Sequence, residues 1–261
     1  MRDILIKGRE EYGVVSVKAE FEAEGTRTDE LLRLLDVAHQ AQLPLTLKIG
    51  GCEAVRDLLE AKQFGVRYLV APMIESEYAL EKFASAIDLV FSPVEQENVD
   101  FLFNMETKSA FEARDSIMSV AETKSEISGV VFGRVDYVGS RGKAREATES
   151  DQVLSDVLTV AEMASNKGLD LVLGGAISVD SITFLSTVSQ KHLTRFETRK
   201  VVFASNSLAL RDVENGLLNA VHFELLWLLN KRTYYERISV EDKNRIDMLE
   251  QRWKMLGREV L

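Results

Sequence analysis

The chain has 261 residues, of which 46% are hydrophobic and 28% are charged, as is usual for a soluble globular protein with a sizeable core. Its 42 acidic residues outnumber its 32 lysines and arginines, and the resulting net charge of −10 argues against a surface that binds nucleic acid or an anionic membrane. The single cysteine excludes an internal disulfide, and no apolar leader or membrane-length run is apparent, so we expect a cytoplasmic protein.

Short apolar runs alternate with amphipathic segments along the chain. Seven runs are typical of β-strands, at residues 14–22, 45–49, 68–74, 99–106, 128–136, 169–173 and 200–204. In the segments between them, apolar residues recur three and four positions apart, as in helices; residues 29–40 (DELLRLLDVAHQ) are an example. Strand–helix alternation over this length predicts a (β/α)₈ TIM barrel and a single domain, residues 1–261.

The two ends of the chain are less regular. An eighth strand is not obvious, so either residues 1–12 supply it or the barrel is incomplete at the first strand. An open, doubly wound sheet is the alternative fold. Residues 208–261 are predicted to form amphipathic helices with large apolar groups such as Trp227 and Trp253. We expect them to close the barrel and to continue into a homo-oligomer contact; the alternative is packing on their own chain.

Side-chain parity predicts which strand residues face the barrel axis, because alternate residues point to opposite sides. The expected inward residues are Ser16, Lys18, Glu20, Glu22, Thr46, Lys48, Leu102, Asn104, Glu106, Val130, Phe132, Arg134 and Asp136. Their charged members gather at the C-terminal ends of the strands, where barrel active sites form. The alternative is a sheet with one solvated face.

Glu106 and Asp136 stand at the ends of consecutive predicted strands. Adjacent strands lie about 4.8 Å apart, so the two carboxylates can converge on one ion. Two oxygen ligands suit Mg²⁺ or Mn²⁺, and without a paired cysteine or a nearby histidine zinc is not expected. Each acid alone is equally typical of a helix cap or an ion pair.

Four segments resemble the HpcH/HpaI aldolase and citrate lyase beta-subunit family of phosphoenolpyruvate/pyruvate-type barrels. They are PLTLKIGG (44–51), YLVAPMIES (68–76), FNMETKSAFEARDSI (103–117) and FGRVDYVGSRG (132–142). The resemblance implies that Glu106 and Asp136 bind the divalent metal. It also implies a small 2-oxo acid or acyl-CoA-type substrate, whose enolate the metal stabilises during carbon–carbon bond cleavage.

The resemblance also suggests which residues contact the substrate. Lys48 lies where the family commonly has an arginine that grips the substrate, and lysine keeps the charge but loses the bidentate geometry. The candidate substrate-binding residues are Lys48, Gly133, Arg134 and Val135, and the candidate catalytic residues are Lys48, Glu22 and Arg134. Arg134 can instead form an ion pair with an acid such as Glu106, and Lys48 can pair with Glu20 or Glu22.

One departure from the family pattern leaves the chemistry open. Pyruvate aldolases of this family carry a histidine directly after the glutamate of the early strand, and Ala23 follows the matching Glu22 here. This favours a citrate-lyase-like relative or a different reaction. The alternatives are a metal-dependent thioester hydrolase and a catalytically silent barrel with a binding or assembly role.

Two later loops are candidate anion sites. Gly174 and Gly175 follow a predicted strand and precede a Ser/Asp-rich helix start, and loops of this kind often hold a phosphate in barrels. Ser205, Asn206 and Ser207, after the last predicted strand, are expected in a similar place.

Overall fold

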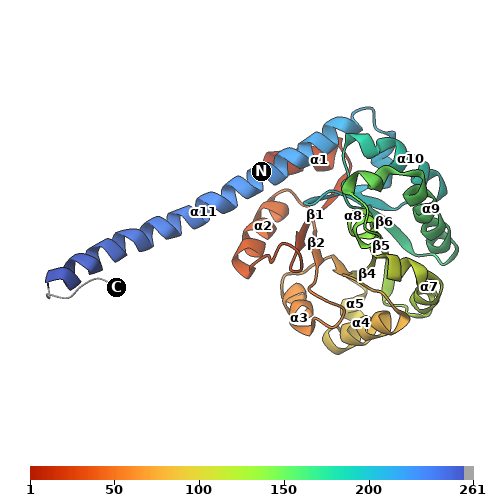
Figure 1. The fold of residues 1–261 in the computed structure, drawn as a ribbon, viewed down its shortest axis with the longest axis horizontal. Coiled ribbons are helices and arrows are strands. Elements are labelled where there is room, and N and C mark those ends of the chain that lie inside the picture. Colours follow the sequence, from red (N-terminus) through yellow and green to blue (C-terminus); the bar gives the residue numbers. More distant parts are fainter. Residues whose placement is uncertain (256–261) are drawn as a thin grey trace.

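The computed structural model describes residues 1–255, which contain a closed barrel of eight strands surrounded by helices (Figure 1). The strands are β1 (Val14–Glu20), β2 (Leu45–Lys48), β3 (Tyr68–Ala71), β4 (Asp100–Met105), β5 (Ile127–Gly133), β6 (Asp170–Gly174), β7 (Arg195–Glu197) and β8 (Val201–Ala204). The α-helices are α1 (Arg2–Glu11), α2 (Thr28–Gln40), α3 (Val55–Gln63), α4 (Glu77–Val90), α5 (Pro93–Gln96), α6 (Lys108–Glu112), α7 (Arg114–Thr123), α8 (Arg134–Ser140), α9 (Asp151–Asn166), α10 (Ile182–Lys191) and α11 (Val213–Met255). Short 3₁₀ turns are η1 (Arg145–Glu149), η2 (Val179–Ser181) and η3 (Ser205–Ala209).

The barrel closes in an unusual way. β1 to β7 run parallel, whereas β8 is antiparallel to both of its neighbours, β7 and β1. β7 and β8 are joined directly by residues 198–200, so a hairpin replaces the last strand–helix unit. The predicted closed barrel is confirmed, but residues 1–12 do not supply a strand. They form α1. The missing strand is β7, which the sequence pattern does not predict because the strand is only three residues long and carries two charges.

The core has two apolar parts. Outward side chains of the strands, such as Phe101, Phe103 and Met105 of β4, pack against the helices and form the main core. Inside the barrel, Val70, Leu102, Val131 and Val172 form a smaller apolar cluster. Further along the same strands, toward their C-terminal ends, the inward positions become polar and charged.

The predicted parity is correct for β1, β2 and β4 but wrong for β5. Val130 and Phe132 belong to the outer core, and Val131 faces the barrel interior. The register against β4 shifts between Phe101 and Leu102, where β5 holds one extra residue, and such a bulge reverses which side chains face inward. The strand also ends at Gly133, so Arg134 and Asp136 lie on helix α8 rather than on a strand.

The C-terminal region is a 3₁₀ turn followed by one long helix, α11. Gly216, Leu217, Ala220, Phe223 and Trp227 of its first half are buried against the barrel, and its second half extends away from the molecule (Figure 1). The last six residues of the predicted C-terminal helices, 256–261, lie outside the described residues. No helix within residues 1–255 has an apolar stretch of the length needed to cross a bilayer.

The inner cluster predicts a large stability effect for Leu102. Leu102→Ala leaves a cavity at a side chain that is 1% exposed, and we expect it to lower the free energy of unfolding by about 2–5 kcal/mol. The matched control is Leu89→Ala, because Leu89 is 72% exposed on α4 and its truncation should cost about 0.5 kcal/mol or less. Urea unfolding of both variants measures the difference, and equal costs would contradict this packing.

Candidate functional site

A cavity with a volume of about 630 Å³ lies at the C-terminal ends of the parallel strands. Its lining comes from β1, β2, β4, β5, β6 and β7, from the loops that follow them, and from Val221 and Glu224 of α11. Six acidic and four basic side chains face it. The acids are Glu20, Glu22, Glu106, Asp136, Glu197 and Glu224, and the bases are Lys18, Lys48, Arg145 and Arg199. The cavity wall therefore carries two negative charges in excess.

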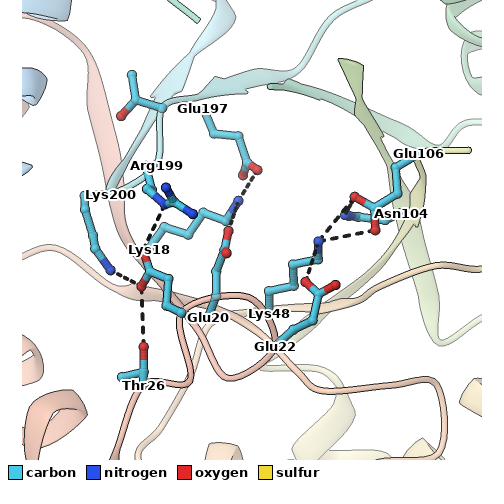
Figure 2. Close-up of polar contacts among 12 residues, drawn as sticks. Lys18, Glu20, Glu22, Thr26, Lys48, Asn104, Glu106, Glu197, Arg199 and Lys200 are labelled. Atoms are coloured by element: carbon cyan, nitrogen blue, oxygen red, sulfur yellow. Dashed lines mark hydrogen bonds and ion pairs between the residues drawn. The ribbon is translucent and has the colours of Figure 1, made fainter. Parts of the chain in front are cut away.

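Lys48 joins two of the predicted site acids (Figure 2). Its ammonium nitrogen lies 3.2 Å from both carboxylate oxygens of Glu106 and 2.8 Å from Oε2 of Glu22. Glu106, which is 1% exposed, also accepts hydrogen bonds from Asn104 Nδ2 at 2.6 Å and from the Met73 backbone N–H at 3.1 Å. The alternative predicted for Lys48, an ion pair with Glu22, is thus present, and the same lysine also contacts Glu106.

A second lysine cluster lies beside the first and was only half predicted (Figure 2). Lys18 of β1 forms ion pairs with Glu20, at 3.1 Å, and with Glu197 of β7. Lys18 and Glu20 were expected to face inward, whereas Glu197 was missed because its strand was missed. The charge-rich run Arg195–Glu197 was the available signal, since a short barrel strand that ends in an inward glutamate fits the parity of the other strands.

Two inward glycines make room for two of these carboxylates. A Cβ on Gly133 would lie 2.8 Å from Oε2 of Glu106, and a Cβ on Gly174 would lie 3.0 Å from Oε1 of Glu197. Gly133 and Gly174 are paired in register at the ends of β5 and β6. Both glycines line the cavity, and any larger side chain at these positions would displace a glutamate.

The pKa directions follow from this pairing. Burial alone would lower the pKa of the Lys48 ammonium, but the carboxylates of Glu106 and Glu22 outweigh it and raise the pKa above the ordinary value. Burial likewise opposes ionisation of Lys18, yet Glu197 and Glu20 raise its pKa. Burial of Glu20 favours its neutral form, but Lys18 lowers the pKa of that carboxyl. All three groups are therefore charged at neutral pH.

Arg134 is not among the residues that face the cavity. Its guanidinium is completely buried and forms an ion pair with Glu149 at 2.8 Å, not with Glu106. It also donates to the backbone oxygens of Gly174, at 3.4 Å, and Gly175, at 2.9 Å. Residues two apart on a helix point in directions about 200° apart. This explains why Arg134 points away from the cavity, toward Glu149, while Asp136 lines the cavity. Arg134 therefore contacts the loop after β6 rather than the cavity.

The donor atoms at the cavity fit a hard divalent cation. Asp136 is exposed and has no hydrogen-bond or ion-pair partner within residues 1–255, although it lines the same cavity as Glu106. Near Glu106, Oδ1 of Asn104 is buried without a hydrogen-bond partner among the described residues. Oxygen donors of this kind suit Mg²⁺ or Mn²⁺. No group of three or more acidic, histidine or cysteine ligands occurs within residues 1–255, so water or substrate must complete such a site.

The other predicted site residues separate into two groups. Gly133, Val135 and the loop residues 174–177 line the cavity. Ala23, at the position where the family pattern has a histidine, also lines it. The predicted turn at residues 205–207 is wrongly placed: β8 runs antiparallel and carries it to the opposite end of the barrel, where Ser207 packs against Gly13. None of the three histidines lines the cavity.

A family model and several solved structures match this chain. The family model described as HpcH/HpaI aldolase/citrate lyase matches residues 27–202. Among solved structures, an HpcH/HpaI aldolase from Desulfitobacterium hafniense DCB-2 is similar, with a TM-score of 0.59 and 16% identity over 74% of this chain and 80% of that one. The citrate synthase SbnG has a TM-score of 0.58 and 17% identity over 76% and 82% of the two chains. Macrophomate synthase has a TM-score of 0.51 and 17% identity over 90% and 91%.

At these identities the solved structures support the fold alone, and no curated protein sequence matches the chain. The family match is stronger, because it spans more than half of the chain and includes β2 to β7 with the lysine, glutamate and aspartate that line the cavity. The chain therefore belongs to the HpcH/HpaI aldolase/citrate lyase family and is a carbon–carbon lyase-type enzyme.

Proposed function

We propose that this protein is a Mg²⁺- or Mn²⁺-dependent lyase that acts through the enolate of a 2-oxo acid or an acyl-CoA-type substrate. The observation that carries the proposal is the convergence of Glu106, Asp136 and Lys48 on one cavity that has an excess of negative charge. Glu106 and Asp136 would hold the metal. When bound, the metal supplies Lewis acidity that stabilises negative charge on the substrate oxygens.

The protein's own groups provide the remaining functions. Lys48 stays protonated, so it supports the reaction as a fixed positive charge beside Glu106 rather than as a base. Glu22 is 24% exposed in its side chain and reaches the cavity from the turn after β1, which makes it the candidate base that removes or returns a substrate proton. Gly133 and Val135 line the wall next to Asp136 and leave room for the substrate carboxylate.

The proposed metal site predicts loss of metal binding and of enolate chemistry in two variants. Glu106→Gln and Asp136→Asn each remove one ligand charge, so we expect Mn²⁺ affinity, followed by electron paramagnetic resonance, to fall at least tenfold. Metal-dependent proton exchange at C3 of pyruvate, followed by NMR, should fall at least a hundredfold. The control is Asp151→Asn, because Asp151 is an exposed acid outside the cavity and its variant should behave as the wild type.

The same measurements separate the alternatives. If the wild type binds no Mn²⁺ and exchanges no proton of pyruvate or oxaloacetate, the enolate proposal is wrong and the barrel is silent toward these substrates. Release of free thiol from acetyl-CoA without cleavage of a carbon chain would instead identify a thioester hydrolase. Circular dichroism of Glu106→Gln shows whether loss of activity reflects unfolding. This control is needed because the variant removes one of the two carboxylates that neutralise the buried ammonium group of Lys48.

The raised pKa of Lys48 predicts that the enzyme forms no imine with its substrate. A Schiff base requires a neutral amine, and both inward lysines, Lys18 and Lys48, are held protonated by buried glutamates. Borohydride treatment in the presence of pyruvate should therefore leave the mass of the protein unchanged. A stable adduct on Lys48 would contradict the proposed role of this residue.

We also propose that the protein is a cytoplasmic homo-oligomer in which α11 meets a second copy. Glu30 of α2 fixes α11 to its own barrel by accepting hydrogen bonds from Tyr235 at 2.6 Å and Lys231 at 3.0 Å. Beyond Tyr235 the helix carries exposed apolar residues, among them Ile238, Ile246 and Leu249. An isolated helix of this kind gains little stability in water, and apolar residues along it favour a partner helix.

The oligomer proposal predicts a change of mass on truncation. A chain ending at Arg237 keeps the contacts to Glu30 and should fold, but it should form a smaller assembly than the full chain in size-exclusion chromatography with light scattering. Ile246→Glu with Leu249→Glu in the full chain tests the same surface by placing charges on it. An unchanged mass in both cases would contradict a contact through this part of α11.

A further inference from the structure

The loop after β6 lines the same cavity as Glu106 and Asp136. We propose that the backbone N–H groups of Gly175, Ala176 and Ile177, together with the guanidinium of Arg145, form an anion subsite for the far end of the substrate. Its occupant would be a carboxylate or phosphate group. The inference rests on the proposed function, because it concerns the substrate of the same cavity, and it adds that this substrate carries two anionic groups.

Arg134 and Ser181 fix the orientation of this loop from behind. Arg134 donates to the carbonyl oxygens of Gly174 and Gly175 and to the Ser181 hydroxyl oxygen at 3.3 Å, and its ion-pair partner Glu149 accepts from the same hydroxyl at 2.7 Å. The carbonyl oxygen of Ala176 lies 3.3 Å from the same hydroxyl. The carbonyl groups of Gly174, Gly175 and Ala176 thus all point toward the buried side chains of Arg134 and Ser181.

The orientation of the carbonyl groups determines that of the N–H groups. In a trans peptide the N–H points opposite to the preceding carbonyl, and residues 1–255 contain no cis peptide. The N–H groups of Gly175, Ala176 and Ile177 therefore point away from Arg134 and Ser181. None of them donates to an acceptor within the described residues, and all three residues line the cavity.

The loop backbone is held in a conformation that suits anion binding. Gly175 has φ 84° and Ala176 has φ 56°, and consecutive N–H groups in such a turn form a concave site for an anion. Only glycine fits at position 175, because a Cβ there would lie 2.7 Å from the backbone nitrogen of Val135. Ala176 has a Cβ and pays a strain energy of about 1 kcal/mol, which the contacts of Arg134 and Ser181 compensate.

Arg145 supplies the charge. It is exposed at the cavity, and its guanidinium forms no hydrogen bond or ion pair within residues 1–255; only its backbone carbonyl oxygen has a partner, the Thr148 hydroxyl at 2.9 Å. Each of the other three basic side chains that line the cavity has an acidic partner: Lys18 has Glu20 and Glu197, Lys48 has Glu22 and Glu106, and Arg199 has Glu24 at 3.3 Å. Arg145 is accordingly the lining cation left to pair with a ligand.

Titration of metal-free protein with inorganic phosphate and, separately, with acetate tests this subsite. In protein labelled with [¹⁵N]alanine, the amide signal of Ala176 is assigned through Ala176→Gly, since glycine accepts the φ of 56°. We expect a saturable shift of this signal with at least one of the two anions, and the tighter one identifies the group as phosphate or carboxylate. EDTA in the buffer keeps the result independent of the metal site.

Arg145→Ala should weaken the binding that shifts the Ala176 signal by about tenfold, as expected for a hydrogen bond to a charged group. The matched control is Lys143→Ala: it removes the same charge from an exposed residue two positions away that does not line the cavity, and it should weaken binding less than twofold. Absence of a saturable Ala176 shift with both anions, or equal weakening by the two variants, would overturn the subsite.

These results do not depend on the proposed reaction. Proton exchange of pyruvate without an Ala176 response would leave the lyase proposal standing and refute the subsite. Anion binding at Ala176 without any enolate chemistry would support the subsite and count against the lyase proposal.

Discussion

The site depends on the interleaving of two buried lysines with four glutamates inside one end of a barrel. Carboxylates at this spacing repel one another and lose solvation, and each uncompensated buried charge costs several kcal/mol. Lys18 lies between Glu20 and Glu197, and Lys48 lies between Glu22 and Glu106. Each lysine thereby joins two different parts of the cavity wall, so the charged layer can exist in the interior only when all the surrounding strands are in place.

This pairing leaves specific groups for a ligand. Most charges around the cavity are neutralised by the protein itself, whereas the side chains of Asp136, Arg145 and Glu224 have no hydrogen-bond or ion-pair partner within residues 1–255. Asp136 is an anion and Arg145 is a cation, and both line the same cavity as Glu106 and the loop after β6. A cavity organised in this way suits a substrate that bridges a metal at one end and a positive charge at the other. Arg134 contacts the backbone of that loop and does not line the cavity.

The buried carboxylates and the loop after β6 also explain the glycines of the site. Gly133 and Gly174 occupy inward positions at the ends of paired strands, where a Cβ would collide with Glu106 or Glu197. Gly175 lets the next loop approach the first turn of α8. Three positions without side chains therefore allow two carboxylates and a set of backbone N–H groups to reach one cavity of about 630 Å³.

The sequence alone determined the barrel, the inward residues of β1, β2 and β4 and the candidate acids, because alternating side chains and strand–helix order are local properties of the chain. It did not reveal the hairpin of β7 and β8, since a three-residue strand has no periodicity. It also wrongly placed Arg134 on the inward face of β5, because a one-residue bulge and the early end of β5 depend on the neighbouring strand. Only the tertiary structure decided which lysine meets which glutamate. Those partners are separated by as many as 179 residues in the chain, and only closure of the barrel brings their charges into contact.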